Sequence, residues 1–414
     1  YELGYMLKHS GAKCLFTIGR YLKTDFVDII ERIKPDLPDL NFCFIIGDNI
    51  PPWGRSFEEA IELGKNVDEN LLNDYIPKEE DYASILYTSG STGLPKGVVM
   101  THRSFIYGAT QVAKRLRIRP YETTLMIVPC SHTVCAFIQF PNILMGRLKV
   151  VMMDTFEATE ALKLYNEEKV SLIYGVPAMF YMMLEHPDFN KYDFKSSRAG
   201  YTGGAIIPDE LTKNVWNKMH CRLVSVYGLS ETGAATMNDV EDDISLVLGT
   251  VGRPLDGVEV KIADENRKPV PKGEVGEVAL RGPILFSGYY KQPELTKAVF
   301  DDEGFFYTGD LGKFLDNGCL AIVGRKKEMI IRGGFNVYPV EVEEQIRTIK
   351  GVQNVAVIGL PDKVMGEKVV ACVIKSPDSN LKEEDIINFC KRRLANYKVP
   401  SMVVFMDEFP VTAM

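Results

Sequence analysis

The chain has 414 residues, 46% of them hydrophobic, and this length predicts two or more domains, each able to bury its own core. Lys and Arg total 48 and Asp and Glu total 56, so the net charge is −8 at pH 7. An acidic chain with no long basic run argues against a nucleic-acid-binding surface.

The cysteines and the hydropathy of the chain argue against zinc-binding, disulfide-rich, secreted and transmembrane proteins. The eight cysteines and five histidines are scattered, without C-x-x-C or clustered Cys/His pairs, which argues against a zinc site or a disulfide framework and favours the cytoplasm. No run of about 18 apolar residues occurs, and the N-terminus lacks the basic-then-apolar layout of a secretory signal. We therefore expect a cytoplasmic protein without a transmembrane segment.

The first part of the chain alternates between predicted strands and helices. A helix is expected at residues 2–10, and short runs rich in Val and Ile predict strands at residues 14–18, 42–46, 85–87, 125–128, 150–153, 172–176 and 223–227. Stretches of helical period separate these runs. Strand followed by helix, repeated in this way, predicts an α/β fold with mostly parallel sheets.

The pattern changes in the last part of the chain. From about residue 246, glycine-punctuated strands at residues 258–262, 275–281 and 319–323 predict an antiparallel β subdomain that extends to residue 324. Beyond it, predicted strands at residues 329–331, 355–359 and 368–374 alternate with helices that begin at Pro339 and Lys382. The sequence therefore predicts a large N-terminal domain, residues 1–324, and a small α+β C-terminal domain, residues 325–414.

A glycine-rich loop connects two strand-like runs within residues 83–100. It reads TSGSTG from Thr88 to Gly93, and Lys96 follows it. Glycines let backbone N–H groups converge on phosphate oxygens, hydroxyls add donors, and the lysine supplies a cation. A flexible surface loop is the simpler explanation for a Ser/Gly tract, but two flanking strands favour a phosphate cradle. Because Lys96 precedes Gly97 and Val98, the spacing differs from that of P-loop kinases and GTPases.

The loop and four further motifs resemble those of the acyl-adenylate-forming superfamily of AMP-dependent synthetases and ligases. This superfamily includes acyl-CoA synthetases, coumarate-CoA ligases, firefly luciferases and peptide-synthetase adenylation domains. The matching motifs, in the order of the family, are YTSGSTGLPKGV at 87–98, YTGGA at 201–205, VYGLSET at 226–232, YTGD at 307–310 and GRKKE at 324–328. The resemblance covers essentially the whole chain. It implies a large region of stacked sheets and helices followed by a small mobile domain.

The resemblance implies a nucleotide site. Tyr227 would stack on adenine, Asp310 and Arg325 would approach the ribose, and Glu231 would hold Mg²⁺. The simpler alternatives are a core aromatic for Tyr227, a turn residue for Asp310 and an exposed side chain for Glu231. The residues implied in nucleotide binding are Thr88, Ser89, Gly90, Ser91, Thr92, Gly93, Gly203, Gly204, Ala205, Tyr227, Gly228, Ser230, Asp310 and Arg325.

Other positions carry roles that also follow only from the resemblance. The implied catalytic residues are Lys96, Glu231 and His132, and the histidine would line the acyl pocket unless it is a buried structural residue. Lys327 matches the hinge of the small domain. Gly333 and Gly334 match the position that flanks coenzyme A, although Gly-Gly is also a common turn.

The implied reaction has two steps. ATP and a carboxylic acid give an acyl-adenylate and pyrophosphate, and coenzyme A then gives a thioester and AMP. The small-molecule partners are therefore a carboxylic acid, ATP and coenzyme A. No acidic residue occurs between Val128 and Val150, where amino-acid-activating relatives carry an aspartate, so an apolar or weakly polar acid is expected.

The resemblance also implies further residues before Tyr1 and a catalytic lysine beyond Met414. A protein ending at Met414 is accordingly expected to form adenylate poorly and still to convert supplied acyl-AMP to thioester. One alternative is an adenylate-forming enzyme that loads a carrier-protein thiol or feeds an oxidation, as luciferase does. Another is a non-catalytic nucleotide-binding relative, but the presence of Lys96, Glu231, Asp310 and Arg325 argues against it.

Overall fold

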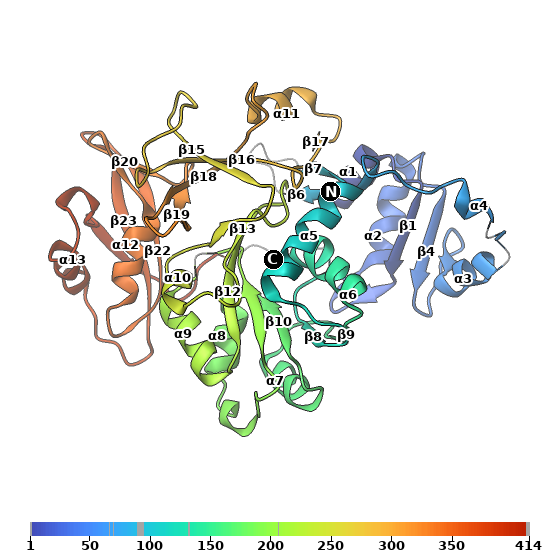
Figure 1. The fold of residues 1–414 in the computed structure, drawn as a ribbon, viewed down its shortest axis with the longest axis horizontal. Coiled ribbons are helices and arrows are strands. Elements are labelled where there is room, and N and C mark those ends of the chain that lie inside the picture. The colour runs from blue at the N-terminus through green and yellow to red at the C-terminus, as the bar shows by residue number, and fades with distance from the viewer. Residues whose placement is uncertain are drawn as a thin grey trace. The chain divides into compact units, whose positions relative to one another are not determined.

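A computed structural model of the chain describes residues 2–65, 67–68, 70–88, 95–130, 133–205 and 207–410, and Figure 1 shows its ribbon. The chain forms two compact units. The first comprises Tyr1–Ile106 and Leu285–Ala298, and the second comprises Tyr107–Ile284 and Val299–Met414. The chain therefore returns to its first unit late in the sequence.

The described residues of the first unit form a two-stranded antiparallel sheet, β2-β3, and two three-stranded sheets. One is parallel with the order β1-β4-β5, and the other is antiparallel with the order β17-β7-β6. Their strands are β1 (Cys14–Ile18), β4 (Phe42–Ile46), β5 (Arg55–Ser56), β6 (Tyr82–Thr88), β7 (Lys96–Thr101) and β17 (Gly288–Tyr289). The remaining elements are α1 (Glu2–Ser10), β2 (Arg20–Tyr21), β3 (Thr24–Asp25), α2 (Phe26–Ile33), α3 (Phe57–Lys65), α4 (Asn70–Asn73) and most of α11 (Pro293–Val299).

The second unit is built on a central sheet with the strand order β14-β13-β12-β11-β10-β8-β9. The run from β12 to β9 is parallel, whereas β13 and β14 are antiparallel. The strands are β8 (Thr123–Met126), β9 (Lys149–Met152), β10 (Leu172–Gly175), β11 (Ala199–Thr202), β12 (Arg222–Tyr227), β13 (Thr236–Met237) and β14 (Arg253–Pro254). Parallel strands buried on both faces explain their continuous apolar runs.

Helices cover both faces of this sheet. One face packs Leu125, Ile173 and Leu223 against Tyr165, Phe180 and other residues of α7, α8 and α9, which lie together in Figure 1. A π-helical segment, Val134–Gln139, leads into α6 on the other face. The helices are α5 (His102–Leu116), α6 (Phe140–Gly146), α7 (Ala158–Glu167), α8 (Pro177–Leu184), α9 (Asp209–Lys218) and α10 (Ile244–Val247).

Two further sheets complete the second unit. An antiparallel sheet contains β15 (Glu259–Ala263), β16 (Gly276–Arg281), β18 (Phe306–Phe314) and β19 (Leu320–Arg325). The last part of the chain contains β20 (Ile330–Arg332), β21 (Phe335–Val337), α12 (Pro339–Arg347), β22 (Val352–Asp362), β23 (Gly366–Lys375), α13 (Glu383–Lys391) and β24 (Met402–Phe405). Its strands form the sheet β21-β20-β23-β22, with β24 paired to β23.

The predicted α/β class with a large N-terminal region and a small α+β C-terminal region is confirmed. One prediction was wrong. The strand before the phosphate loop was grouped with the strands of mostly parallel sheets, but it is β6, which pairs antiparallel with β7. The short loop between the two strands permits antiparallel pairing, whereas parallel neighbours need a long crossover. The domain bounds at residues 324 and 325 stay a prediction. Among the described residues, no helix is both long and apolar enough to span a membrane.

Candidate active site

Two neighbouring parallel strands end at the residues predicted to hold adenine. β11 ends at Thr202 and β12 ends at Tyr227, and Thr202 pairs in register with Ser225. In open α/β sheets, ligands bind at the carboxyl ends of such strands. The YTGGA and VYGLSET motifs therefore meet at the edge of the sheet where a ligand is expected.

The turn after β11 brings its backbone close to β12. A Cβ atom on Gly203 would lie 2.6 Å from the carbonyl oxygen of Val226, so no larger residue fits without a backbone shift. Gly204 has a φ of +79°, in the left-handed region that favours glycine. Gly204 and Ala205 are exposed. The backbone here is consequently open to a flat ligand.

The turn after Tyr227 is fixed by Thr232, which is fully buried. Its hydroxyl accepts a hydrogen bond from the N–H of Leu229 at 3.0 Å. Gly228 allows the turn to close, because a Cβ atom there would lie 1.7 Å from the carbonyl oxygen of Gly233. This turn presents the two residues predicted at the phosphate end of the site, Ser230 and Glu231, and both are half-buried.

Asp310 joins the predicted adenine and ribose residues. The hydroxyl of Tyr227 donates to Oδ2 of Asp310 at 2.8 Å, and Nε of Arg325 lies 3.1 Å from Oδ1. Asp310 and Arg325 face each other across β18 and β19. The structure therefore places Asp310 within a strand rather than in a turn. It also brings together three residues that are far apart in the sequence.

Burial dominates the electrostatics of this cluster. It raises the pKa of Asp310, while Arg325 and the hydrogen bond from Tyr227 lower it and the charges of Glu328 and Glu231 raise it again. Burial also raises the pKa of Tyr227 well above its ordinary value, so the hydroxyl stays a donor. A poorly solvated carboxylate of this kind is a strong hydrogen-bond acceptor for hydroxyl groups.

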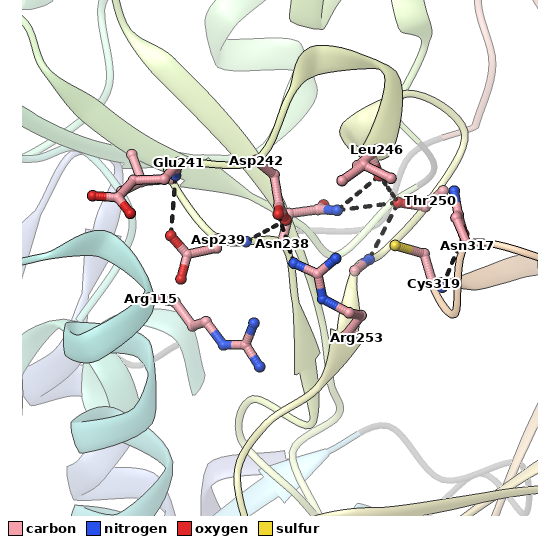
Figure 2. A network of polar contacts seen from close by, with 12 residues as sticks. Arg115, Asn238, Asp239, Glu241, Asp242, Leu246, Thr250, Arg253, Asn317 and Cys319 are labelled. Carbon is pink, nitrogen blue, oxygen red and sulfur yellow. Dashed lines mark hydrogen bonds and ion pairs between the residues drawn. The ribbon is translucent and has the colours of Figure 1, made fainter.

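A buried polar network, shown in Figure 2, holds β12 in place. Asn238 accepts from the backbone N–H of Ser225 in β12 at 3.3 Å and donates to Thr250 at 3.2 Å. Nearby, Arg253 forms an ion pair with Asp242 at 2.6 Å. A satisfied network of this kind rigidifies its surroundings. The strand that carries Tyr227 is therefore fixed from its far side.

In the first unit, the phosphate-loop hairpin is described at its two ends. Thr88 and Lys96 pair directly as the last residue of β6 and the first of β7. Nζ of Lys96 lies 5.0 Å from the ring centroid of Tyr289, a cation–π distance. The predicted loop residues Ser89, Gly90, Ser91, Thr92 and Gly93 lie outside the described residues, and so does His132.

Sequence analysis missed a cluster that supports this hairpin. Nδ1 of His9 lies 2.8 Å from the hydroxyl of Tyr87, and the imidazole packs edge-on against Tyr87 and Tyr290. Burial and then the charge of Lys291 lower the pKa of His9, and burial raises the pKa of Tyr87 to about 12. The tautomer of His9 decides which of the two groups donates this hydrogen bond. The two residues are 78 positions apart, and no motif marks the histidine.

Family models match both parts of the chain. The model described as AMP-binding enzyme matches residues 1–290, and the one described as AMP-binding enzyme C-terminal domain matches residues 341–414. The chain belongs to the AMP-binding enzyme family. The resemblance inferred from the five motifs is thus confirmed.

Individual members of the family are similar over almost the whole chain. A CoA ligase of Rhodococcus jostii (strain RHA1), named for a methyl-dioxo-octahydroindenyl propanoyl group, is 36% identical over 98% of this chain and 82% of its own length. Medium-chain fatty-acid–CoA ligase of Escherichia coli (strain K12) is 30% identical over 99% of this chain and 72% of its own. The crystal structure of ATP-bound MatB from Rhodopseudomonas palustris matches with a TM-score of 0.87 and 29% identity, over 100% and 79% of the two chains. The predicted enzyme class agrees with the ligase names.

Glu231 suits the Mg²⁺ expected in an AMP-binding enzyme. Its charge is close enough to Asp310 to raise the pKa of that carboxyl. Mg²⁺ is commonly held by one or two carboxylates together with substrate phosphates. Within the described residues, no group of three or more His, Cys, Asp or Glu side chains could form a separate metal cage. The single carboxylate therefore fits an ion that binds together with a nucleotide.

The predicted hinge and coenzyme A residues lie in two consecutive turns. Lys327 is exposed in the turn between β19 and β20. Gly333 and Gly334 connect β20 to β21 with φ values of +59° and +83°, as a type I′ hairpin turn requires. The simpler explanation of the Gly-Gly pair as a turn is therefore correct, and its role toward coenzyme A stays a prediction.

Proposed function

We propose that the chain is an AMP-forming acyl-CoA synthetase that activates a carboxylic acid with ATP and transfers the acyl group to coenzyme A. The observation that carries the proposal is the buried Asp310 held between Tyr227 and Arg325, beside the glycine turn at the end of β11. This arrangement offers an aromatic surface and a hydroxyl-accepting carboxylate to one nucleoside. The compartment we propose is the cytoplasm.

In the first step, a carboxylate oxygen of the acid attacks the α-phosphorus of ATP, and the bond to pyrophosphate breaks. Both reactants are anionic, so the transition state requires cations and oriented N–H groups. Lys96 supplies one cation next to the glycine loop from Ser89 to Gly93. From their motifs, we assign Ser230 and Gly228 to the nucleotide, Thr88 to the phosphate loop and His132 to the acid. A bound Mg²⁺, held by Glu231, would neutralise phosphate charge.

In the second step, the thiolate of coenzyme A attacks the acyl carbonyl carbon, and AMP leaves with the former carboxylate oxygen. Gly333 and Gly334 leave the backbone of their turn uncovered by side chains, which suits the approach of a slender pantetheine arm. Lys327 provides the rotation that separates the two steps. The names of the R. jostii and E. coli relatives support an acid with a largely apolar body.

The experiment is an assay of the full-length protein for pyrophosphate, AMP and acyl-CoA, with ATP, coenzyme A and a panel of carboxylic acids. Lys96→Met should lower kcat by at least about 100-fold, because an uncompensated phosphate charge remains in the transition state. Lys65→Met, which removes an exposed lysine paired with Glu62, is the control and should keep full activity. Release of ADP and phosphate instead of AMP and pyrophosphate would refute the proposal.

A further inference from the structure

We propose that the acid activated by this chain carries a neutral oxygen substituent, a hydroxyl or a ketone, at the end remote from its carboxyl group. The inference rests on the proposed function and specifies its substrate class. It is carried by a group of fully buried polar side chains between the central sheet and the helical segment of residues 134–146. These side chains are Gln139, Asn142, Tyr174 and Tyr201.

The two tyrosines lie side by side on one face of the sheet. Tyr174 of β10 and Tyr201 of β11 are register partners, and their rings stack with centroids 4.6 Å apart. Met126 of β8 pairs with Tyr174 on the other side. Because side chains alternate between faces along a strand, Thr124 shares this face with Met126. The face opposite is the apolar one that α7, α8 and α9 cover.

These polar side chains carry unsatisfied atoms. Within the described part of the chain, no hydrogen-bond partner exists for the hydroxyls of Tyr174 and Tyr201, for Oε1 of Gln139, or for either amide atom of Asn142. All four side chains are at most 1% exposed. Buried polar atoms are nearly always paired, because leaving them unpaired forfeits their hydration. Several such atoms on facing elements therefore indicate a place that receives a polar group.

The helical segment of residues 134–146 runs from the carboxyl ends of the strands toward their amino ends. Cys135 and Gln139 belong to the π-helical segment, and Asn142 follows in the first turn of α6; all three side chains are buried. Cys135 packs against Met126 and Val128 at the carboxyl end of β8, whereas Nε2 of Gln139 donates to Thr124 at 3.4 Å, nearer the amino end. The chain continues directly from Gln139 into α6. Asn142 is therefore the deepest of the three.

Polarity changes along this direction. The shallow part, at the carboxyl ends of the strands, is apolar and includes Met126, Val128 and Cys135, with Met179 packed against them. Methionine adapts its shape readily, so this part can accommodate different apolar bodies. The deep part is mixed: Gln139 and Asn142 add polar atoms there, whereas Ile143 and Val150, the register partner of Thr124, pack against the same apolar cluster. An acid with its carboxylate at the nucleotide edge would place an apolar body first and its far end beside Gln139 and Asn142.

Two charged side chains near the hydroxyl of Tyr174, Arg198 and Glu122, are paired with each other. Arg198 forms a two-pronged ion pair with Glu122 at 2.6 and 2.8 Å and also donates to the carbonyl of Leu116. These charges shift the pKa of Tyr174 in opposite directions, Glu122 upward and Arg198 downward, which places them near its hydroxyl. The guanidinium is thus already neutralised. A neutral hydroxyl or ketone suits the site better than a second carboxylate.

The test compares acids of equal chain length in the full-length protein: a saturated fatty acid, its terminal hydroxy and keto counterparts, and the dicarboxylic acid. We expect kcat/KM for pyrophosphate release to favour the hydroxy or keto acid over the saturated one by at least about 10-fold, because a site with unpaired polar groups rejects the analogue that leaves them unpaired. The dicarboxylic acid should be the poorest substrate.

Variants connect this preference to the named residues. Tyr174→Phe and Asn142→Leu should each lower the ratio of kcat/KM for the oxygenated and saturated acids by at least about 10-fold, with little loss for the saturated acid. Tyr165→Phe is the matched control. Tyr165 is equally buried, but its hydroxyl is paired with Ser197 at 2.7 Å on the opposite face of the sheet. This variant should leave the ratio unchanged.

The inference would be overturned if the oxygenated and saturated acids had equal kcat/KM, or if the variants lowered all rates without changing the ratio of the two kcat/KM values. The buried polar atoms would then be hydrogen-bonded to water. If no acid releases pyrophosphate, the proposed function fails instead. The inference is then decided by the melting temperature in the presence of AMP. In the wild type, the oxygenated acid must raise the melting temperature more than the saturated acid does. In Asn142→Leu this difference must disappear. Any other result contradicts the inference.

Discussion

At the scale of single residues, Asp310 has both carboxylate oxygens engaged. Tyr227, which is 8% exposed, holds one of them, and Arg325, whose side chain is 63% exposed, holds the other. The buried partner cannot move without disturbing the core, whereas the exposed one can. We therefore expect the ribose to displace Arg325 rather than Tyr227.

Asp310→Asn should raise the KM for ATP by about 10- to 100-fold, because hydrogen bonds to a charged acceptor contribute about 1.5–3 kcal/mol. The KM for the acid should change little. Steady-state kinetics with each substrate varied in turn makes the comparison. Asp316→Asn, at a fully exposed position before Cys319, serves as the control. An equal rise in both KM values would show that the substitution disturbs the fold rather than the nucleotide site.

Asp310→Asn should weaken ATP binding without lowering the stability of the fold, because the pKa of Asp310 is raised. A carboxyl whose pKa is higher in the folded than in the unfolded state favours folding at low pH, and this contribution is lost as the pH rises through the folded-state value. At pH 7.5 the melting temperature of Asp310→Asn should therefore equal or exceed that of the wild type. The difference should shrink as the pH falls and the wild-type carboxyl gains a proton. A large destabilisation at pH 7.5 would contradict this assignment.

At the scale of elements, the end of β11 is defined by two glycines with different constraints. Gly203 lies against the carbonyl of Val226, whereas Gly204 has open space around it and a φ of +79°. The first glycine is required by close packing and the second only by its backbone conformation.

Substitution by alanine should separate these two constraints. Gly204→Ala should cost about 1–2 kcal/mol, the strain of a left-handed residue. Gly203→Ala should cost more and also raise the KM for ATP, because β11 must move away from β12. Chemical denaturation of both variants provides the comparison. Equal losses of stability would show that the close approach of the two strands is not tight.

Helices and strands were predictable from the sequence where a continuous local run of residues marks them. The helix at residues 2–10 and the strands at 14–18 and 42–46 have the predicted bounds, because each is a continuous run between turn residues. The two-residue strands β13 and β17 carry no period that could reveal them.

The site was predictable in its motifs but not in its partners. The glycines and acidic residues of the motifs identify the nucleotide site, yet Tyr227 and Asp310 are 83 positions apart and their hydrogen bond depends on the packing of separate sheets. The unpaired amide of Asn142 is equally invisible in sequence, where an asparagine in a helix suggests only an exposed residue.

At the scale of the whole molecule, the proposed reaction requires the small C-terminal domain to serve two steps. Lys327 lies in the turn in which the N–H groups of Glu328 and Met329 both donate to the carbonyl of Arg325. We assign the proposed rotation to the backbone of Lys327, which follows β19 and precedes β20.

Lys327→Pro should change the two half-reactions unequally, because proline fixes φ and prevents the rotation. We expect the ratio of adenylate formation to thioester formation from supplied acyl-AMP to change by at least about 10-fold. Lys327→Ala, which leaves the backbone free, should keep both rates near those of the wild type. Parallel losses in the proline variant would argue against a hinge at this position.

In the proposed reaction, the chain joins a carboxylate to the α-phosphate of ATP. The most direct measurement uses an acid labelled with heavy oxygen in both carboxyl positions and mass spectrometry of the products formed by the full-length protein. Attack on the α-phosphorus, followed by transfer to the thiol, predicts AMP with one heavy oxygen and unlabelled pyrophosphate. Unlabelled AMP, or label in inorganic phosphate released together with ADP, would contradict it.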